Sequence, residues 1–585
     1  MSTMDFKTIV HSADLCVVGG GLAGLCAAVE AARHGAKVVL MQERPMLGGN
    51  ASSEIRMWVC GAHGENNRET GILEELMLEN LYRNHDFNYS IWDGVLLECV
   101  QREENITLLL NCACNSCEMR GNSIASVTGW QMTTQTWHRV EAKLFADCSG
   151  DSVLAPITGA EFRMGRETRA EFDEDIEPEE ADSHTMGMSL LIQAREQARP
   201  SRFTPPEWAH RYTAEQLRHR VPDMSDPMEN FWYLELGGMV DSISDTEKVR
   251  DELLKVAYGI WDYVKNAPEN AEKNKYWALD WMGILPGKRE SRRYVGDIIM
   301  NQNDVLAGGH FPDVVAYGGW KMDDHDPMGF EGDGHPTIFH NAPSPYGIPY
   351  RCLYSRNIEN LMFAGRNISA THAAMSSSRV MATCAILGQA MGAAAAIAVS
   401  ENTTPRGVYE RYIEKLRQTL MDDDCFLPYA VRRVNGSVRS ARLEAKYEPL
   451  RNGHDRPLNG ADNGVFLRKG ETVGYAFHAP QYVERTRIVF DSDLNRKLMG
   501  ILPQRNMPCN RRNDMPEAAM PETLVRCYRL EAVDKDGNTM TLAEVSENRR
   551  RLVRHRVGME IKALRLTPLE TWGAESCHLF SFDFE

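Results

Sequence analysis

The chain lacks the features that would place it in a membrane or on nucleic acid. No run of about 18 apolar residues is present, so we expect no membrane-spanning helix. It has no excess of basic residues: 65 Lys and Arg stand against 82 Asp and Glu, a net charge of −17, which disfavours nucleic acid as a partner. Residues 1–14 lack the apolar core of a signal peptide. These absences favour a cytoplasmic protein.

Internal repeats and low-complexity tracts are missing too. The length of 585 residues allows about three or four domains. Fourteen cysteines are present, many of them in apolar runs, and in the cytoplasm we expect them to be reduced and buried.

The clearest motif begins with an apolar run at residues 13–18 that is typical of a strand. It continues through Gly19, Gly21 and Gly24 into a helix-forming stretch. In such a turn Gly19 bends the chain, Gly21 lets the backbone approach a pyrophosphate, and Gly24 lets helix and strand pack closely. The amino end of the following helix offers free N–H groups and a positive dipole to phosphates.

The surroundings of this motif support a dinucleotide site. A second strand at residues 37–41 is followed by Glu43, an acid placed to bind ribose hydroxyls. A glycine pair, Gly48 and Gly49, comes soon after and suggests backbone lying along a long cofactor such as FAD. Further glycine pairs, near residues 308 and 318, lack a strand–turn–helix context, so we expect no separate nicotinamide-binding domain.

The remaining pattern predicts an α/β protein: a Rossmann-like FAD-binding domain with an inserted α+β cap or substrate domain, plus a C-terminal β-sandwich (jelly roll). The predicted boundaries are 12–160 and 346–400 for the two parts of the FAD-binding domain, 161–345 for the cap, 401–435 for a helical connector and 436–585 for the sandwich. In the first four segments we expect a helix at 68–84, a β meander starting at 106–110 and continuing at 123–130 and 138–145, a loop at 167–182, a strand at 361–366, a polar loop at 367–376 and a helix at 378–399. Strands of the sandwich are expected at 437–447, 472–478, 486–490, 523–532, 539–544, 560–566 and 577–584.

Five stretches together resemble the FAD-dependent oxidoreductase family related to the flavoprotein subunits of fumarate reductase and succinate dehydrogenase. They are residues 17–28, 42–50, 146–155, 286–297 and 364–396, and the resemblance covers residues 13–400. The tail at 436–585 resembles a galactose-binding, discoidin-type jelly roll. The resemblance implies FAD, a cap over the isoalloxazine ring and redox chemistry at flavin N5. Residues 44–47 lack the histidine that attaches FAD in the respiratory relatives, so we expect noncovalent FAD.

Carried over by resemblance, the glycine turn and Glu43 hold the ADP half of FAD, and a second group of residues faces the flavin. The residues implied to bind FAD are Gly19, Gly20, Gly21, Leu22, Ala23, Gly24, Glu43, Arg44, Gly49, Asn50, Ser52, Cys114, Ser149, Gly150, Gly365, Arg366, Ser378, Arg379 and Val380.

Three residues are candidates for catalysis. Arg289 lies in a cluster with Glu290, Arg292 and Arg293, and could clamp a substrate carboxylate or hydroxyl; a structural ion-pair network is the alternative. His63 and His372 lie in loops expected near the flavin, and either could handle the proton that accompanies hydride transfer. The alternative for each is a hydrogen-bonded loop histidine.

Metal chemistry is not expected. His310, His325, His335 and His340 lie in one Gly- and Pro-rich stretch, but their spacing matches no metal site. The cysteines at 112, 114 and 117 are too few for an iron–sulfur cluster, and alternation on a strand explains two of them.

The leading hypothesis is therefore an FAD-dependent oxidoreductase that transfers hydride between flavin N5 and a polar small molecule, such as a carbohydrate or hydroxy acid. A glycan-binding protein with a non-catalytic flavin scaffold is the alternative. A flavoprotein that modifies RNA is disfavoured by the acidic balance. The oligomeric state is not indicated.

Overall fold

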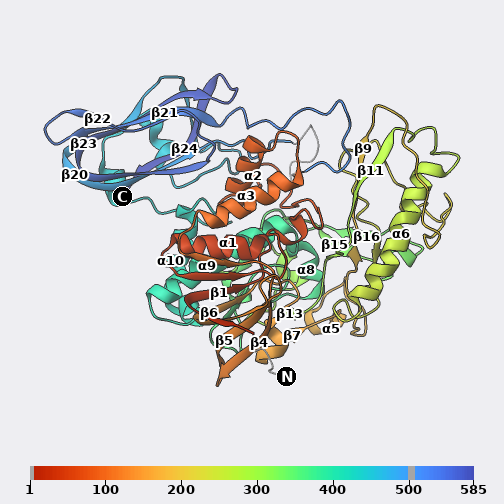
Figure 1. Ribbon diagram of the computed structural model, residues 1–585. Helices are drawn as coiled ribbons and strands as arrows, with labels where there is room; N and C mark the ends of the chain where they lie inside the picture. Colours follow the sequence, from red (N-terminus) through yellow and green to blue (C-terminus); the bar gives the residue numbers. More distant parts are fainter. Residues whose placement is uncertain (1–5, 498–506) are drawn as a thin grey trace. The chain divides into compact units, whose positions relative to one another are not determined.

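The computed structural model describes residues 6–497 and 507–585, which form two compact units (Figure 1). The first unit comprises Met1–Ala62, Phe87–Leu416 and Gln504–Glu517. The second comprises His63–Asp86, Arg417–Pro503 and Ala518–Glu585. The finer division into cofactor domain, cap and connector stays a prediction.

A seven-stranded sheet forms the centre of the first unit. Its order is β3-β2-β1-β6-β5-β4, and β18 pairs with β6 as well. Strands β3, β2, β1, β6 and β18 run parallel, whereas β4, β5 and β6 form an antiparallel meander. The bounds are Thr8–Val18 (β1), Val38–Met41 (β2), Ile106–Leu109 (β3), Cys112–Arg120 (β4), Ser123–Gln131 (β5), Thr136–Asp147 (β6) and Leu361–Phe363 (β18).

Two helices lie side by side on this sheet, α1 (Leu22–Arg33) and α9 (Met381–Ser400) (Figure 1). The two helices pack closely at Gly388, where a Cβ would collide with the carbonyl of Ala23. Within the described residues, α9 is long and apolar enough to cross a membrane, but 94% of its most apolar window is buried inside the protein.

The part of the first unit between β6 and β18, which we call the inserted region, contains short strands and one long amphipathic helix, α6 (Thr246–Asn266). Apolar residues of α6 such as Leu253 and Trp261 pack with Met188 and Leu190 in a core of their own. The other elements of this region are β7 (Phe162–Arg163), α5 (Arg169–Phe172), β8 (Met188–Ser189), β9 (Ile192–Glu196), β10 (Glu235–Leu236), β11 (Trp277–Met282), β12 (Gly287–Lys288), β13 (Arg293–Tyr294), α7 (Gln302–Leu306), β14 (Val314–Gly318), β15 (Met322–His325), β16 (Thr337–His340) and β17 (Tyr346–Pro349).

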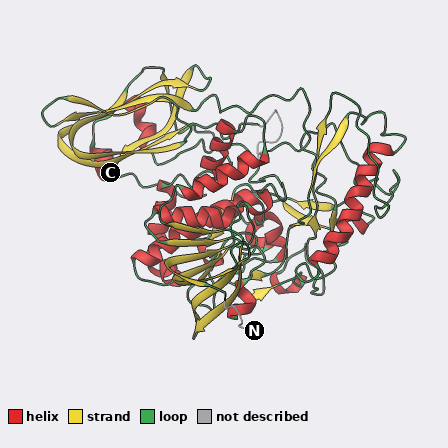
Figure 2. Cartoon of the chain, viewed as in Figure 1, coloured by secondary structure: helices red, strands yellow, loops and turns green. Residues whose placement is uncertain are grey.

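The second unit contains a six-stranded antiparallel sheet, drawn as yellow strands in Figure 2. Its order is β19-β24-β20-β23-β21-β22. The bounds are Val465–Arg468 (β19), Val473–Phe490 (β20), Val525–Asp534 (β21), Thr539–Val545 (β22), Leu552–Thr571 (β23) and Ser576–Phe584 (β24). Bulges in β20 shift its register on β23, as expected for long strands that bend through a sandwich. The predicted fold class is confirmed.

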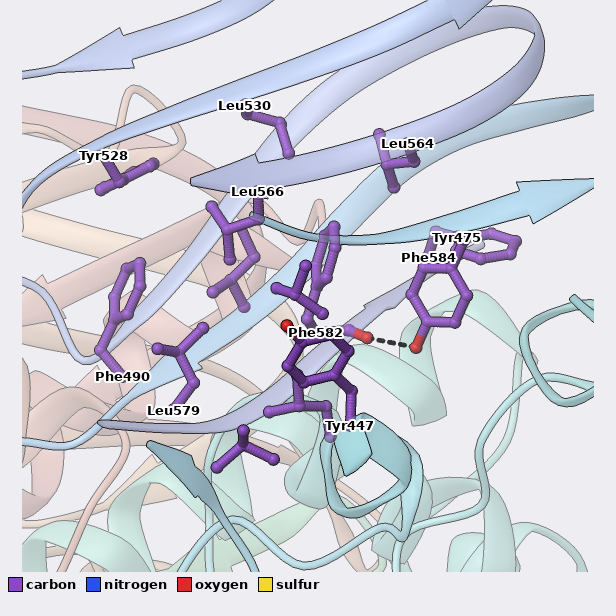
Figure 3. Close-up of a cluster of buried hydrophobic side chains, with 14 of the residues drawn as sticks. Tyr447, Tyr475, Phe490, Tyr528, Leu530, Leu564, Leu566, Leu579, Phe582 and Phe584 are labelled. Atoms are coloured by element: carbon purple, nitrogen blue, oxygen red, sulfur yellow. Dashed lines mark hydrogen bonds between the residues drawn. The ribbon is translucent and has the colours of Figure 1, made fainter. Parts of the chain in front are cut away.

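Aromatic and aliphatic side chains fill the core of this sandwich (Figure 3). Phe490, Phe582 and Leu566 are fully buried, and the hydroxyl of Tyr475 donates a hydrogen bond to the carbonyl of Phe582 at 2.6 Å. Burying the phenol therefore leaves no unsatisfied donor.

Helices outside the two sheets complete the chain. In the first unit these are α3 (Tyr89–Gln101), α4 (Leu154–Thr158) and α8 (His372–Ser378); in the second they are α2 (Ile72–Arg83) and α11 (Gly436–Ser440); α10 is Pro405–Asp422.

Four local predictions are wrong. The strand at 106–110 does not start the meander, because β3 pairs in parallel with β2. The strand predicted at 437–447 is instead α11, which the side chain of Asn435 caps, followed by a 3₁₀ turn containing Pro449. The loop at 167–182 contains the short helix α5, and the polar loop at 367–376 contains the start of α8.

Side chains far away in the sequence cap helix α8. The amide of His372 donates to Glu167 at 2.9 Å, and that of Ala373 donates to Glu177 at 2.8 Å. The side chain of Thr371 accepts from Ala374. These bonds satisfy free N–H groups at the start of the helix. The capping position disfavours the charged form of Glu177, because burial raises its pKa to about 7.

Glu177 makes the stability depend on pH. The pKa of Glu177 in the folded protein lies above the ordinary value, so the protonated carboxyl stabilises the fold at acidic pH. This stabilisation is lost as pH rises toward 7. Glu177→Gln keeps the acceptor for Ala373 without the charge. At pH 8 we expect the free energy of unfolding of this variant to exceed that of the wild type by about 2 kcal/mol. Its melting temperature should therefore be higher. Thermal melts of both proteins at pH 5 and pH 8 check this. Equal gains at the two pH values would contradict it.

Candidate active site

The glycine turn between β1 and α1 is tightly packed. Gly19 has a φ of +103°, and a Cβ there would overlap the backbone of Cys148. A Cβ at Gly24 would collide with the carbonyl of Gly19. Gly21 differs, because a Cβ there would come no closer than 3.9 Å to its nearest neighbour, the Cα of Gly49. Protein atoms therefore pack tightly against Gly19 and Gly24, whereas the space beside Gly21 is open.

Gly21 opens onto a cavity of about 390 Å³, within the range of small-molecule and cofactor sites. Sixteen of the sequence-predicted site residues line it: Gly19, Gly21, Leu22, Ala23, Glu43, Arg44, Gly49, Asn50, Cys114, Ser149, Gly150, Arg289, Gly365, Arg366, Arg379 and Val380. The predicted residues outside the lining are Gly20, Gly24, Ser52, His63, His372 and Ser378.

Two helix amino ends face this cavity. Gly21 is the N-cap of α1 and Val380 is the N-cap of α9, and both residues line the cavity. Among the described residues, no side chain caps either helix. The amino-terminal turns and the positive ends of two helix dipoles therefore point toward the same space, where they favour negative charge.

Arginines on the cavity wall hold unused donors. Burial leaves Nε and Nη1 of Arg44, Nε of Arg366 and Nε of Arg379 without a hydrogen-bond partner among the described residues. Arg366 also pairs with Asp151 at 2.7 Å, as Lys288 does. Burial alone would raise the pKa of Asp151, but Arg366 and Lys288 hold it below its ordinary value.

A charged network lies on another part of the wall, around His325 of β15. Nδ1 of His325 lies 2.6 Å from Glu235, and Nε2 lies 3.3 Å from Asp323. Glu235 is also 3.4 Å from Arg289, and Asp323 is 3.1 Å from Arg379. Burial would raise the pKa values of both carboxyl groups, but the neighbouring cations hold them below their ordinary values. A chain of five ionisable side chains thus runs from Arg379 through His325 to Arg289.

Arg289 is largely used by the protein itself. Its Nη1 donates to Ser189 at 2.9 Å and its Nη2 to the carbonyl of Trp232 at 2.9 Å. Arg292 lines the cavity, whereas Arg293 is buried in ion pairs with Glu167 and Glu290. Arg293 is therefore part of a structural ion-pair network. Arg289 also makes structural contacts, but it lies on the cavity wall as well.

The two predicted histidines are placed elsewhere. His372 is 1% exposed, with Nδ1 2.9 Å from Glu290 and Nε2 3.2 Å from Asp324. Burial lowers the pKa of His372, but these two carboxylates raise it well above its ordinary value, so the ring is held as a cation. His63 belongs to the second unit, where its carbonyl accepts a hydrogen bond from Asn67.

The residues weighed as metal ligands are also separated. His335 packs against His219 with ring centroids 4.4 Å apart, whereas His325 lies in the charged network. Cys112 and Cys114 are buried on β4, and the thiol of Cys117 donates to the carbonyl of Ile157 at 2.7 Å.

Sequence reasoning did not single out Trp58, Trp232, Trp320, Phe339 and Asp323 as site residues, and it weighed His325 only as a metal ligand. These residues come from loops and short strands of the inserted region and from the loop after β2. Their one sequence signal is the concentration of Trp and His in residues 161–345.

The family model described as FAD dependent oxidoreductase matches residues 14–420. The chain belongs to this family. FAD is therefore its cofactor, and the chain is an FAD-dependent oxidoreductase. The residues present fit FAD, because an open glycine turn, two helix amino ends and unpaired arginine donors line one cavity.

Solved structures show more distant similarity. A geranylgeranyl bacteriochlorophyll reductase-like protein of Thermoplasma acidophilum is 12% identical, with a TM-score of 0.33, over 71% of this chain and 86% of that one. E. coli quinol fumarate reductase FrdA is 12% identical, with a TM-score of 0.28, over 71% and 75%. The family 32 carbohydrate-binding module of Streptococcus pneumoniae EndoD is 13% identical, with a TM-score of 0.19, over 26% and 97%. No curated protein matches the chain.

Gly21 offers a test of the cofactor position. A methyl group at Gly21 meets no protein atom closer than 3.9 Å, so Gly21→Ala should leave the melting temperature of the apoprotein unchanged. We expect FAD binding to weaken at least tenfold, because the methyl group blocks the approach of the diphosphate. Titration of apoprotein with FAD measures this.

Gly94→Ala is the matched control, since Gly94 lies within α3 and a Cβ there would meet no atom within 4 Å. FAD affinity of this variant should equal that of the wild type. Unchanged FAD affinity in Gly21→Ala would show that the diphosphate binds elsewhere.

Proposed function

We propose that this oxidoreductase transfers hydride between flavin N5 and a polar small molecule, with a carbohydrate or a hydroxy acid as the substrate class. The observation that carries the proposal is the charged network on the cavity wall, from Arg379 through Asp323, His325 and Glu235 to Arg289. Burial of ionisable groups is costly unless they pair with each other or bind a ligand.

FAD, when bound, supplies the two-electron acceptor or donor. The guanidinium groups of Arg289 and Arg379 are suited to bind substrate oxygen atoms, since planar guanidinium donors match carboxylate and hydroxyl oxygens. Arg379 is the freer of the two, because its Nε is buried without a partner among the described residues.

His325 is placed to move a proton. Both of its ring nitrogens face carboxylates, Glu235 at Nδ1 and Asp323 at Nε2. The neutral ring donates one N–H and keeps a lone pair on the other nitrogen. Oxidation of a hydroxyl carbon releases a proton as well as a hydride, and this lone pair can accept the proton. The protonated ring then donates to both carboxylates.

The surroundings of the cysteines support the proposal of a reducing compartment such as the cytoplasm. All 14 cysteines are free thiols in the structure, and 12 of them are buried. Noncovalent attachment of FAD also remains our proposal, resting on the absence of histidine from residues 44–47.

Anaerobic mixing tests the substrate class. The yellow holoprotein is mixed without oxygen with sugars, sugar acids and 2-hydroxy acids, and the flavin absorption band at about 450 nm is followed. Bleaching by one of these classes is the expected result. If all of them leave the band unchanged while dithionite bleaches it, the substrate belongs to a different class.

Replacing His325 tests its role in proton transfer. We expect His325→Gln to keep FAD bound but to slow flavin reduction by the substrate at least 100-fold, the lower range for loss of general acid–base catalysis. Stopped-flow absorption measures the rate. His340→Gln is the control, since His340 lies on the adjoining strand β16 and outside the cavity lining. Equal rates in His325→Gln and His340→Gln would refute the role.

A further inference from the structure

A segment from the C-terminal part of the chain supports the cavity wall. Residues 507–513 lie between β20 and β21 in sequence, yet they pack in the first unit. We call them the wall segment. Met507 and Cys509 are fully buried, and so is Asn510. Residues 507–510 of the wall segment therefore lie in the interior of the first unit, whereas Arg512 and Asn513 are exposed.

Backbone hydrogen bonds attach the wall segment to the inserted region. Arg511 donates to Ala194 at 2.8 Å, and Glu196 donates to the carbonyl of Arg511 at 2.7 Å, so the segment pairs in parallel with β9. Cys509 donates to the carbonyl of Pro227 at 2.7 Å. The segment thus joins β9 to the loop that contains Pro227.

Both of these partners lead into the cavity wall. Strand β9 follows Leu191, and the loop after Pro227 contains Trp232; Leu191 and Trp232 line the cavity. The side chain of Asn230 in this loop lies 3.5 Å from the sulfur of Met57, another lining residue.

The wall segment also contacts the lining directly. The indole N–H of Trp58 donates to the sulfur of Cys509 at 3.1 Å. Trp58 is 4% exposed and lines the cavity, and Cys509 is fully buried. Removing the Cys509 sulfur takes a hydrogen-bond acceptor away from a buried indole N–H, which is unfavourable and favours rotation of the ring.

We propose that Cys509 is a positioning residue, which orients the Trp58 indole in the cavity wall of the oxidoreductase. The inference rests on the proposed function only in taking this cavity as the flavin site. It assigns the C-terminal part of the chain a role in the redox site, through the wall segment.

The alternative is that Cys509 merely fills space. A small buried hydrophobe would pack equally well at that point, and any loss on truncation would then be a loss of stability alone. Orientation of Trp58 predicts a change in the flavin environment as well. The two roles therefore separate when stability and flavin spectra are measured together.

The test compares Cys509→Ala, Cys509→Ser, Trp58→Phe and the double variant Cys509→Ala with Trp58→Phe in the full chain loaded with FAD. We expect Cys509→Ala and Trp58→Phe to alter the visible circular dichroism of bound FAD in the same way. Each should weaken FAD binding about fivefold, the effect of one ordinary hydrogen bond. The double variant should match the single ones, because both changes remove the same contact.

Cys509→Ser retains an acceptor for the indole and should stay close to the wild type. If Cys509→Ala does not fold, the test uses the two remaining single variants. Cys509→Ser should then have the flavin spectrum of the wild type, and Trp58→Phe should have an altered one. Cys352→Ala is the control, since Cys352 is buried in the first unit but lies outside the cavity lining. It should lower the melting temperature and leave the flavin spectrum unchanged.

Three results would overturn the inference: a flavin spectrum of Cys509→Ala that equals that of Cys352→Ala, effects that add in the double variant, or a Trp58→Phe spectrum like that of the wild type. A wild-type chain that does not bind FAD at all would instead contradict the proposed function.

Discussion

Close contact between the turn at Gly19–Gly24 and its neighbours is the constraint on which the site depends. Gly19 and Gly24 carry no Cβ, and none would fit at either position, so the start of α1 can lie directly against the end of β1. Helix α9 packs on α1 in the same way, because Gly388 lies against the carbonyl of Ala23. Two helices can therefore direct their amino ends toward one cavity, where their dipoles add.

Charge is distributed to match this geometry. The chain as a whole has a net charge of −17, but arginines and Lys288 gather around the cavity. Some of them are compensated by buried acids, as Lys288 is by Asp151. Arg44 lies 3.7 Å from Glu54 but keeps two buried N–H groups without a hydrogen-bond partner among the described residues. An acidic protein thereby presents a locally positive site, which a diphosphate and a reduced flavin both require.

The candidate site shows where sequence reasoning succeeds and where it stops. Local sequence identifies the glycine turn, Glu43 and the start of α9, because each depends on neighbours within a few residues. His372 is a candidate because its loop is expected near the flavin, but α8 begins there, capped by Glu167 and Glu177 from about 200 residues away. His325 is brought to the cavity by β15, a strand of four residues that carries no periodic signal.

The sequence by itself determined the fold class, the glycine turn and sixteen of the residues that line the cavity. Glycine spacing and apolar periodicity act over short range, so they can be read without coordinates. Only the tertiary structure decided which ionisable groups share the cavity wall around His325, and that residues 507–513 belong to the first unit. Burial and pairing between distant segments depend on how the chain packs, and no local pattern encodes them.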